Sequence, residues 1–196
     1  MIRAEEVEKR YGQRRALRPV SFALDRGGFL VVTGANGAGK TTLLRLLAGL
    51  AAPTRGALAV DASRDRLGYL GHEALVYGEL SAVENLELFG RLYRVPERRE
   101  RIGMLLERLG LWEARRERVS AYSRGMRQRL ALCRVLLHDP ELLVLDEPFT
   151  ALDEEGADRL DEELRRLVGA STVVLATHDQ DRVAGLSTGH LALVAS

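Results

Sequence analysis

The sequence predicts an α/β protein built on a mostly parallel β-sheet. Three short apolar runs, at residues 29–33, 142–145 and 172–176, are typical of strands that are buried on both faces. Between the second and third runs, residues 154–168 carry leucines at helical spacing amid charged side chains. Strand, helix and strand in this order indicate a parallel sheet with right-handed crossovers.

Two other regions of the chain follow different patterns. Alternating or β-rich sequence in the first 25 residues and at residues 56–60 predicts a small antiparallel sheet beside the main one. The middle of the chain carries three helical patterns with no strand among them, at residues 82–93, 97–109 and 124–138. We therefore expect one domain, residues 1–196, whose core is interrupted by a helical subdomain at about residues 74–138.

Composition narrows the classes of function. The 29 Lys and Arg residues nearly balance the 28 Asp and Glu residues, and the net charge of +1 does not favour a nucleic-acid partner. No stretch approaches the roughly 20 apolar residues that cross a bilayer. The N-terminus is acidic where a secretory signal needs an apolar core, so we expect an intracellular protein. The single cysteine, Cys133, lies in an apolar run and is predicted to pack in the core.

A glycine-rich loop at residues 34–41 carries the strongest chemical signal in the chain. It reads GANGAGKT and fits the pattern G-x-x-x-x-G-K-[ST], with a strand predicted before it and a helix after it. In such a loop, backbone N–H groups surround phosphate oxygens, the lysine reaches the β- and γ-phosphates, and the threonine hydroxyl binds Mg²⁺. The predicted nucleotide-binding residues here are Gly34, Asn36, Gly37, Ala38, Gly39, Lys40, Thr41 and Thr42.

Polar side chains also follow the other two buried runs. Asp146 falls at the carboxyl edge of the predicted sheet, where parallel sheets bind ligands, and is a candidate for the Mg²⁺ shell. Glu147 comes next and is positioned to polarise a water for attack on a γ-phosphate. The plain alternative is a solvated acidic turn before Pro148. His178 follows the third run, and a lone histidine at a strand end is more often a surface or capping residue.

The context for these residues comes from a predicted helix start. Ser123, with Gly125 two residues later, fits either a second anion-binding site or an ordinary helix cap. Together the motifs resemble the nucleotide-binding subunit of ATP-binding cassette (ABC) transporters, over nearly the whole chain. The resemblance rests on the order of phosphate loop, helical insert, Ser-x-Gly segment, Asp-Glu strand, Ala-Leu-Asp at residues 151–153, and His178. It implies a P-loop NTPase of the ABC cassette type.

The resemblance also implies roles for individual residues. Tyr11 resembles the aromatic residue that stacks on adenine, with a simple hairpin aromatic as the alternative. Residues 123–127 resemble the signature that closes over the γ-phosphate held by the opposite subunit, so that two ATP molecules lie within a head-to-tail homodimer. Asp153 resembles the aspartate at the dimer contact. His178 resembles the histidine that contacts the γ-phosphate and positions the attacking water near the catalytic Glu147.

One position departs from the family pattern. Where the family has a glutamine, at the entry to the helical insert, this chain has His72, followed by Glu73. Either residue can bind the metal or its water, or sense the membrane partner. Three segments, at residues 69–73, 80–86 and 123–130, resemble the ATP-binding subunit of the haem exporter of cytochrome c biogenesis. The chain has no Cys-x-x-Cys-His motif for haem, so cargo specificity would lie in the membrane subunits.

The leading hypothesis is an ATPase that uses ATP and Mg²⁺, works as an ATP-dependent homodimer and powers haem export through separate integral membrane subunits. Such a subunit would be peripheral, on the cytoplasmic face of the membrane. The alternative is the ATPase of a drug, lipid or polyketide exporter. A soluble cassette acting on DNA or the ribosome is disfavoured, because such relatives usually carry two cassettes or a long coiled coil. A binding module that no longer hydrolyses ATP is disfavoured by intact Lys40, Asp146, Glu147 and His178.

Overall fold

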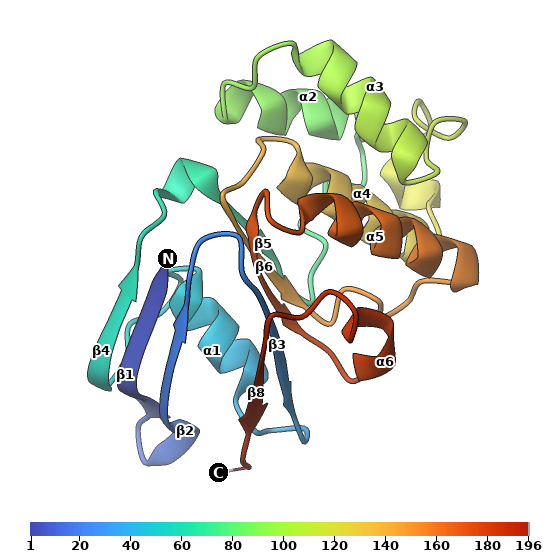
Figure 1. The fold of residues 1–196 in the computed structure, drawn as a ribbon. Helices are drawn as coiled ribbons and strands as arrows, with labels where there is room; N and C mark the ends of the chain where they lie inside the picture. The colour runs from blue at the N-terminus through green and yellow to red at the C-terminus, as the bar shows by residue number, and fades with distance from the viewer. Residues whose placement is uncertain (196) are drawn as a thin grey trace.

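The computed structural model describes residues 1–195, and its larger sheet has five strands in the order β5-β6-β7-β3-β8 (Figure 1). All neighbouring strands in this sheet run parallel. The three inner strands, β6, β7 and β3, bury most of their residues, and β6 and β7 are buried at every position, as continuous apolar runs predict. The predicted parallel sheet is therefore confirmed. The strands are β3 (Phe29–Gly34), β5 (Leu67–Leu70), β6 (Leu142–Asp146), β7 (Thr172–Ala176) and β8 (Gly189–Leu193).

A smaller antiparallel sheet is formed by β1 (Ile2–Tyr11), β2 (Arg14–Leu24) and β4 (Arg55–Val60), in the order β2-β1-β4. This sheet was predicted from the first 25 residues and from residues 56–60. Helix α1 (Lys40–Leu47) lies between the two sheets (Figure 1). Its leucines join one apolar cluster with side chains from both sheets, so the helix holds the sheets together.

The helical insert lies between β5 and β6 in the chain and forms the top of the molecule in Figure 1. It contains α2 (Ala82–Leu92), α3 (Arg98–Arg108) and α4 (Arg124–Leu136), within two residues of the predicted ends. Helix α2 starts with a capping box, in which Ser81 Oγ accepts from Glu84 N and Ser81 N donates to Glu84 Oε2. Helix α5 (Glu154–Leu167) follows β6 and lies beside α4.

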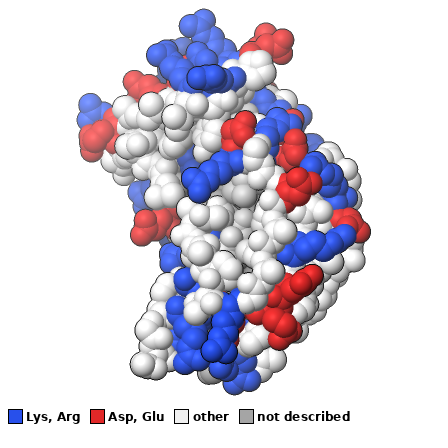
Figure 2. Space-filling view, turned by 90° about the vertical axis from the view of Figure 1, so that its left-hand side faces the viewer, with Lys and Arg blue, Asp and Glu red and all other residues white. Residues whose placement is uncertain are grey.

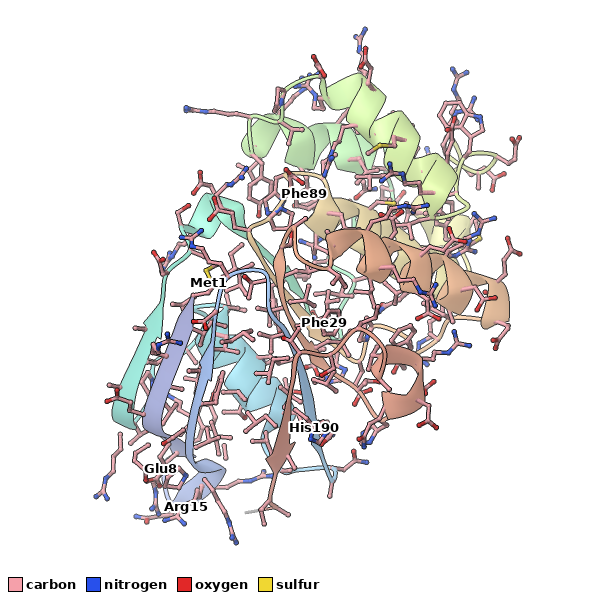
Figure 3. All side chains as sticks on the ribbon, viewed as in Figure 1. Met1, Glu8, Arg15, Phe29, Phe89 and His190 are labelled. Atoms are coloured by element: carbon pink, nitrogen blue, oxygen red, sulfur yellow. The ribbon has the colours of Figure 1, made fainter. Side chains whose placement is uncertain are left out.

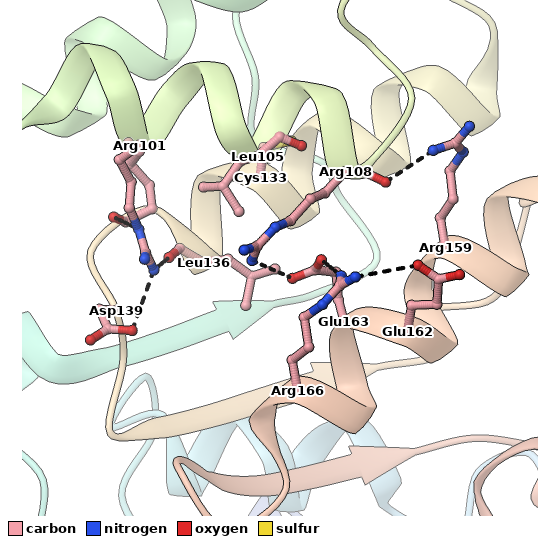
Figure 4. A network of polar contacts seen from close by, with 11 residues as sticks. Arg101, Leu105, Arg108, Cys133, Leu136, Asp139, Arg159, Glu162, Glu163 and Arg166 are labelled. Carbon is pink, nitrogen blue, oxygen red and sulfur yellow. Dashed lines mark hydrogen bonds and ion pairs between the residues drawn. The ribbon is translucent and has the colours of Figure 1, made fainter.

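Polar contacts join α3 to the helices beneath it (Figure 4). Glu163 of α5 is buried and accepts from Arg166, and it pairs with Arg108 of α3 at 3.7 Å. Arg101 of α3 donates to the Leu136 carbonyl oxygen at 2.9 Å. Cys133 is fully buried against α3, and burial raises the pKa of its thiol. The predicted packing role of this cysteine is confirmed.

The sequence patterns did not predict β8, at the edge of the parallel sheet, or the short α6 (Gln180–Val183) before it. Strand β8 alternates between exposed residues and buried or half-buried ones, and it contains Gly189 and His190, so its sequence lacks the continuous apolar run of the inner strands. Within residues 1–195, every helix is too short or too polar to span a bilayer.

Candidate functional site

The turn between β3 and α1 wraps around a hollow at the carboxyl edge of the parallel sheet. Gly37 and Gly39 take left-handed backbone angles, with φ of +84° and +102°. A Cβ atom on Gly39 would lie 2.6 Å from the Ala16 carbonyl oxygen, so the close approach of the loop to β2 requires glycine. Because Gly39 has no side chain, it caps none of the first N–H groups of α1. The helix therefore starts with donors directed at the hollow.

The Lys40 ammonium lies on the floor of this hollow. Its Nζ donates to the Gly34 carbonyl oxygen at 2.8 Å and lies 3.2 Å from His178 Nε2. It also lies 3.9 Å from Glu147 Oε1, and the side chain is mostly buried. The cation is therefore fixed by groups from three separate segments, which all meet at the same sheet edge.

Asp146 ends β6 beside this lysine, and its carboxylate has no hydrogen-bond partner among the described residues. The side chain is only 1% exposed. A buried carboxylate without a partner is unfavourable, so these two oxygens suit a bound cation. The Thr41 hydroxyl and the His72 imidazole approach from the other side, with His72 Nε2 lying 3.3 Å from Thr41 Oγ1 and 3.5 Å from Asp146 Oδ2. A carboxylate and a hydroxyl are the oxygen ligands that suit Mg²⁺.

Glu147 and His178 contact each other beside Lys40. Glu147 Oε1 lies 3.2 Å from His178 Nε2, and Glu147 Oε2 accepts from the His178 backbone N–H at 3.2 Å. Glu147 has a positive φ of 49°, which costs a side-chain-bearing residue about 1–3 kcal/mol. Its backbone N–H donates to the Ala176 carbonyl oxygen, which holds this turn against β7. The strained turn directs the carboxylate towards His178.

These groups line a cavity of about 910 Å³. Most of the residues predicted from the sequence line it: Tyr11, Asn36, Gly37, Gly39, Lys40, Thr41, Thr42, His72, Asp146, Glu147 and His178. The Gly34 carbonyl oxygen accepts a hydrogen bond from Lys40, and Ala38 is a buried residue of the loop. Tyr11 is 52% exposed, with Lys9 Nζ 5.0 Å from its ring centroid. A half-exposed ring at the entrance offers a face on which a flat group can stack.

Sequence reasoning missed two arginines of this cavity. Arg14 and Arg15 begin β2 and line the cavity beside Tyr11. Arg15 Nε donates to the buried Glu8 at 3.1 Å, and Figure 3 shows these two side chains together near the β1-β2 turn. Figure 2 shows Lys and Arg side chains gathered at this lower end of the molecule. The sequence signal that could have identified them is the pair of arginines shortly after Tyr11, the aromatic residue of the hairpin.

Three other predicted residues lie outside the cavity. Ser123 caps α4, where its Oγ accepts from the Met126 N–H at 3.1 Å. Gly125 packs against the segment that follows β6, because a Cβ atom on it would lie 2.9 Å from the Ala151 carbonyl oxygen. Asp153 caps α5 by accepting from the Gly156 N–H at 3.0 Å. Within one chain, then, these residues act as helix caps and packing contacts. Glu73 also does not line the cavity.

Comparison with known proteins identifies the family of this chain. The family model described as ABC transporter matches residues 17–150, which is more than half of the chain. The chain belongs to the ABC transporter family. Two relatives illustrate its place in the ABC family. The daunorubicin resistance ATP-binding protein DrrA3 of Streptomyces coeruleorubidus is 43% identical over 187 residues, which cover 90% of this chain and 59% of that protein. The ABC transporter ATP-binding protein NatA of Bacillus subtilis is 34% identical over 203 residues, which cover 95% of this chain and 82% of NatA.

Solved structures agree on the fold of this ABC family member. The ATP-binding subunit of an ABC transporter superposes with a TM-score of 0.89 at 26% identity, over 98% of this chain and 85% of that one. A dimeric ATP-binding cassette bound to ADP and phosphate, in a post-hydrolysis state, superposes with a TM-score of 0.88 at 27% identity. That match covers 98% of this chain and 94% of the other. The predicted ABC cassette fold is confirmed. The chain spans about three fifths of the length of the DrrA3 protein.

Proposed function

We propose that this chain is the ATP-hydrolysing subunit of an ABC transporter. The observation that carries the proposal is the convergence of Lys40, Asp146, Glu147 and His178 at the mouth of a glycine-rich loop. Phosphoryl transfer to water requires a cation beside the phosphates, a carboxylate that can bind a metal ion and a group that orients the water. Lys40, Asp146, and Glu147 with His178 can supply these three functions. Family membership supports the same reading.

Each of the residues that line the site then has a role in ATP hydrolysis. The first N–H groups of α1 and the Lys40 ammonium bind the β- and γ-phosphate oxygens and stabilise the charge that develops on them. Thr41 and Asp146 would hold Mg²⁺, which supplies further neutralisation of phosphate charge when bound. Glu147 orients a water molecule and accepts its proton at a carboxylate oxygen. His178 holds Glu147 and reaches the γ-phosphate.

The entrance of the cavity fits the rest of the nucleotide. Tyr11 offers its ring face to adenine, and Arg14 and Arg15 lie beside it. The Arg15 guanidinium pairs with Glu8, which keeps its charge in place next to the ring. Guanidinium groups suit phosphate and ribose oxygens because they present several donors in one plane.

A homodimer completes the site in this proposal. Ser123, Gly125 and Asp153 do not line the cavity of their own chain, so any contact with nucleotide requires a second copy. The solved cassette that is bound to ADP and phosphate is dimeric, which supports a head-to-tail dimer held by two ATP molecules. The dimer would depend on ATP because the phosphates supply the contacts between the two surfaces.

Exposed apolar side chains support docking to integral membrane subunits at the cytoplasmic face of the membrane. Tyr77, in the segment before α2, and Leu88 and Leu92 on α2 leave about half or more of their surface in water. Tyr77 stacks on Phe89 with ring centroids 6.2 Å apart, so this segment and α2 form one surface. Large apolar side chains gathered on one surface are typical of a protein contact.

The cargo that fits best is a drug-like compound. None of the relatives named above is a haem exporter, whereas DrrA3 is a daunorubicin resistance protein. A linearmycin resistance protein of Bacillus subtilis is also 30% identical. The alternative of a drug, lipid or polyketide exporter therefore has better support than haem export, which rested on three short segments at residues 69–73, 80–86 and 123–130.

A phosphate-release assay with a matched pair of variants tests the ATPase proposal. Asp146→Asn removes the charge of the buried carboxylate, and Asp139→Asn makes the same change at an exposed site. Hydrolysis should fall by about 100-fold or more in Asp146→Asn, because a metal-binding charge is lost from the site. It should change by less than about twofold in Asp139→Asn, as expected for the surface. Equal hydrolysis in Asp146→Asn and wild type would contradict the proposal.

A further inference from the structure

The cation site of this chain contains a nitrogen atom beside its oxygens. His72 lies in the segment after β5, and its side chain is 61% exposed. Even so, its Nε2 atom is directed at the interior of the cavity, towards Thr41 and Asp146. Magnesium sites in proteins are built from oxygen ligands, whereas imidazole suits first-row transition metals.

The three donor atoms are already close to the spacing of neighbouring metal ligands. His72 Nε2 lies 3.3 Å from Thr41 Oγ1 and 3.5 Å from Asp146 Oδ2. Adjacent ligands of an octahedral ion, each at about 2.1 Å, lie about 3 Å apart. A hydrogen bond between His72 and Thr41 accounts for the position of these two side chains but not for Asp146, because both of its carboxylate oxygens lack a hydrogen-bond partner within the described part of the chain. A shared cation would satisfy the carboxylate and the imidazole together.

The site does not hold a metal by protein groups alone. Within residues 1–195, no three or more His, Cys, Asp or Glu side chains gather as a metal cluster. One carboxylate, one hydroxyl and one imidazole leave several positions for phosphate oxygens and water. A cation would therefore bind here together with a nucleotide, and the imidazole would decide which cation is favoured. Glu73, the neighbouring candidate, does not line the cavity and is not needed.

We propose that His72 is a direct ligand of the nucleotide-bound cation and shifts the preference of this site from Mg²⁺ towards Mn²⁺ and Co²⁺. The inference rests on the proposed nucleotide-binding function. Affinity of nitrogen-containing sites rises along the first-row series, whereas Mg²⁺ gains little from an imidazole and keeps its waters. The effect should appear as a change in the ratio of Mn²⁺ to Mg²⁺ affinity and not as a change in nucleotide affinity in general.

Electron paramagnetic resonance of Mn²⁺ bound with ADP tests the inference without measuring hydrolysis. Electron spin echo envelope modulation should detect ¹⁴N coupling from a directly bound imidazole in the wild-type chain. The coupling should disappear in His72→Gln and persist in His190→Gln, a matched histidine that bonds to Thr33 and does not line the cavity. It should also persist in His178→Gln, which excludes the other histidine of the cavity as its source.

Competition titrations give the second readout. With ADP present, the ratio of Mg²⁺ to Mn²⁺ dissociation constants should fall about tenfold in His72→Gln, which is the lower end of the effect typical for a lost metal-site contact. It should stay unchanged in His190→Gln. Absence of ¹⁴N coupling in the wild type, coupling that survives in His72→Gln, or an unchanged ratio would each overturn the inference.

A fluorescent ADP analogue separates this inference from the function on which it rests. If the analogue binds with Mg²⁺ and with Mn²⁺ but the ¹⁴N coupling is absent, only the role of His72 is wrong. If the analogue binds with neither ion, the proposed nucleotide-binding function fails, and the role of His72 fails with it.

Discussion

Helices α1 and α4 both begin at residues predicted to bind phosphate, but the two helix starts differ. Helix α1 starts at Gly39, which provides no side-chain cap, and its N–H groups are directed at the cavity. Helix α4 starts at Ser123, whose hydroxyl already accepts from an N–H group of the first turn. The first start has Lys40, Asp146 and Glu147 around it, whereas Ser123 lies outside that cavity.

This difference shows that the start of a helix can serve two purposes. An uncapped helix start inside a cavity binds an anion by itself, because its donors have no other partner. A capped start is stable without a ligand and can receive a phosphate that another chain holds. We therefore propose that helix α1 forms the primary nucleotide site of this chain and that α4 forms the surface that a second copy would use. Substitutions at the two helix starts should therefore have separable effects.

The largest expected effect comes from the lysine at the start of α1. Lys40→Ala removes the buried cation that we propose to bind the β- and γ-phosphates, so hydrolysis should fall by about 100-fold to 1,000-fold. A phosphate-release assay measures the loss, and the unfolding midpoint in denaturant serves as the control for folding. Wild-type turnover in a folded Lys40→Ala protein would show that α1 is not the primary site.

A bulky side chain at the start of α4 should prevent assembly without preventing nucleotide binding to the single chain. Ser123→Arg fills the helix start, so the ATP-dependent dimer should be lost while the monomer still binds nucleotide within about twofold of the wild type. Ser120→Arg, at an exposed position before the helix, should leave the dimer intact. Size-exclusion chromatography and nucleotide titration measure the two properties separately. A Ser123→Arg protein that dimerises with ATP would contradict the role given to α4.

The smallest effect tests the cap itself. Ser123→Ala removes the bond to the Met126 N–H, so the free energy of unfolding should fall by about 1 kcal/mol. Denaturant titration without nucleotide measures this difference. No change in stability would show that Ser123 does not cap α4 in solution.

Much of the fold and of the α1 site could be predicted because the signals are local. The glycine-rich loop is a continuous motif, and buried parallel strands read as continuous apolar runs. Strand β8 was missed because an edge strand has one exposed face and lacks such a run. Arg14 and Arg15 were missed because cations on a hairpin also fit a solvated surface.

The open choice between His72 and Glu73 shows the limit of sequence reasoning most clearly. Both follow β5, and only the direction of each side chain decides which one meets Asp146. That direction depends on packing between segments that are more than 70 residues apart in the chain. The roles of Ser123 and Asp153 stayed open for another reason, because they depend on a second copy of the chain.

The most direct test of the account is the mass of the Glu147→Gln protein with and without MgATP, measured by size-exclusion chromatography with light scattering. The amide keeps the size of the side chain but accepts no proton from water, so ATP should bind and persist. We predict the mass of one chain without nucleotide and twice that mass with MgATP, alongside strongly reduced phosphate release. The same mass in both conditions, or phosphate release at the wild-type rate, would contradict the account.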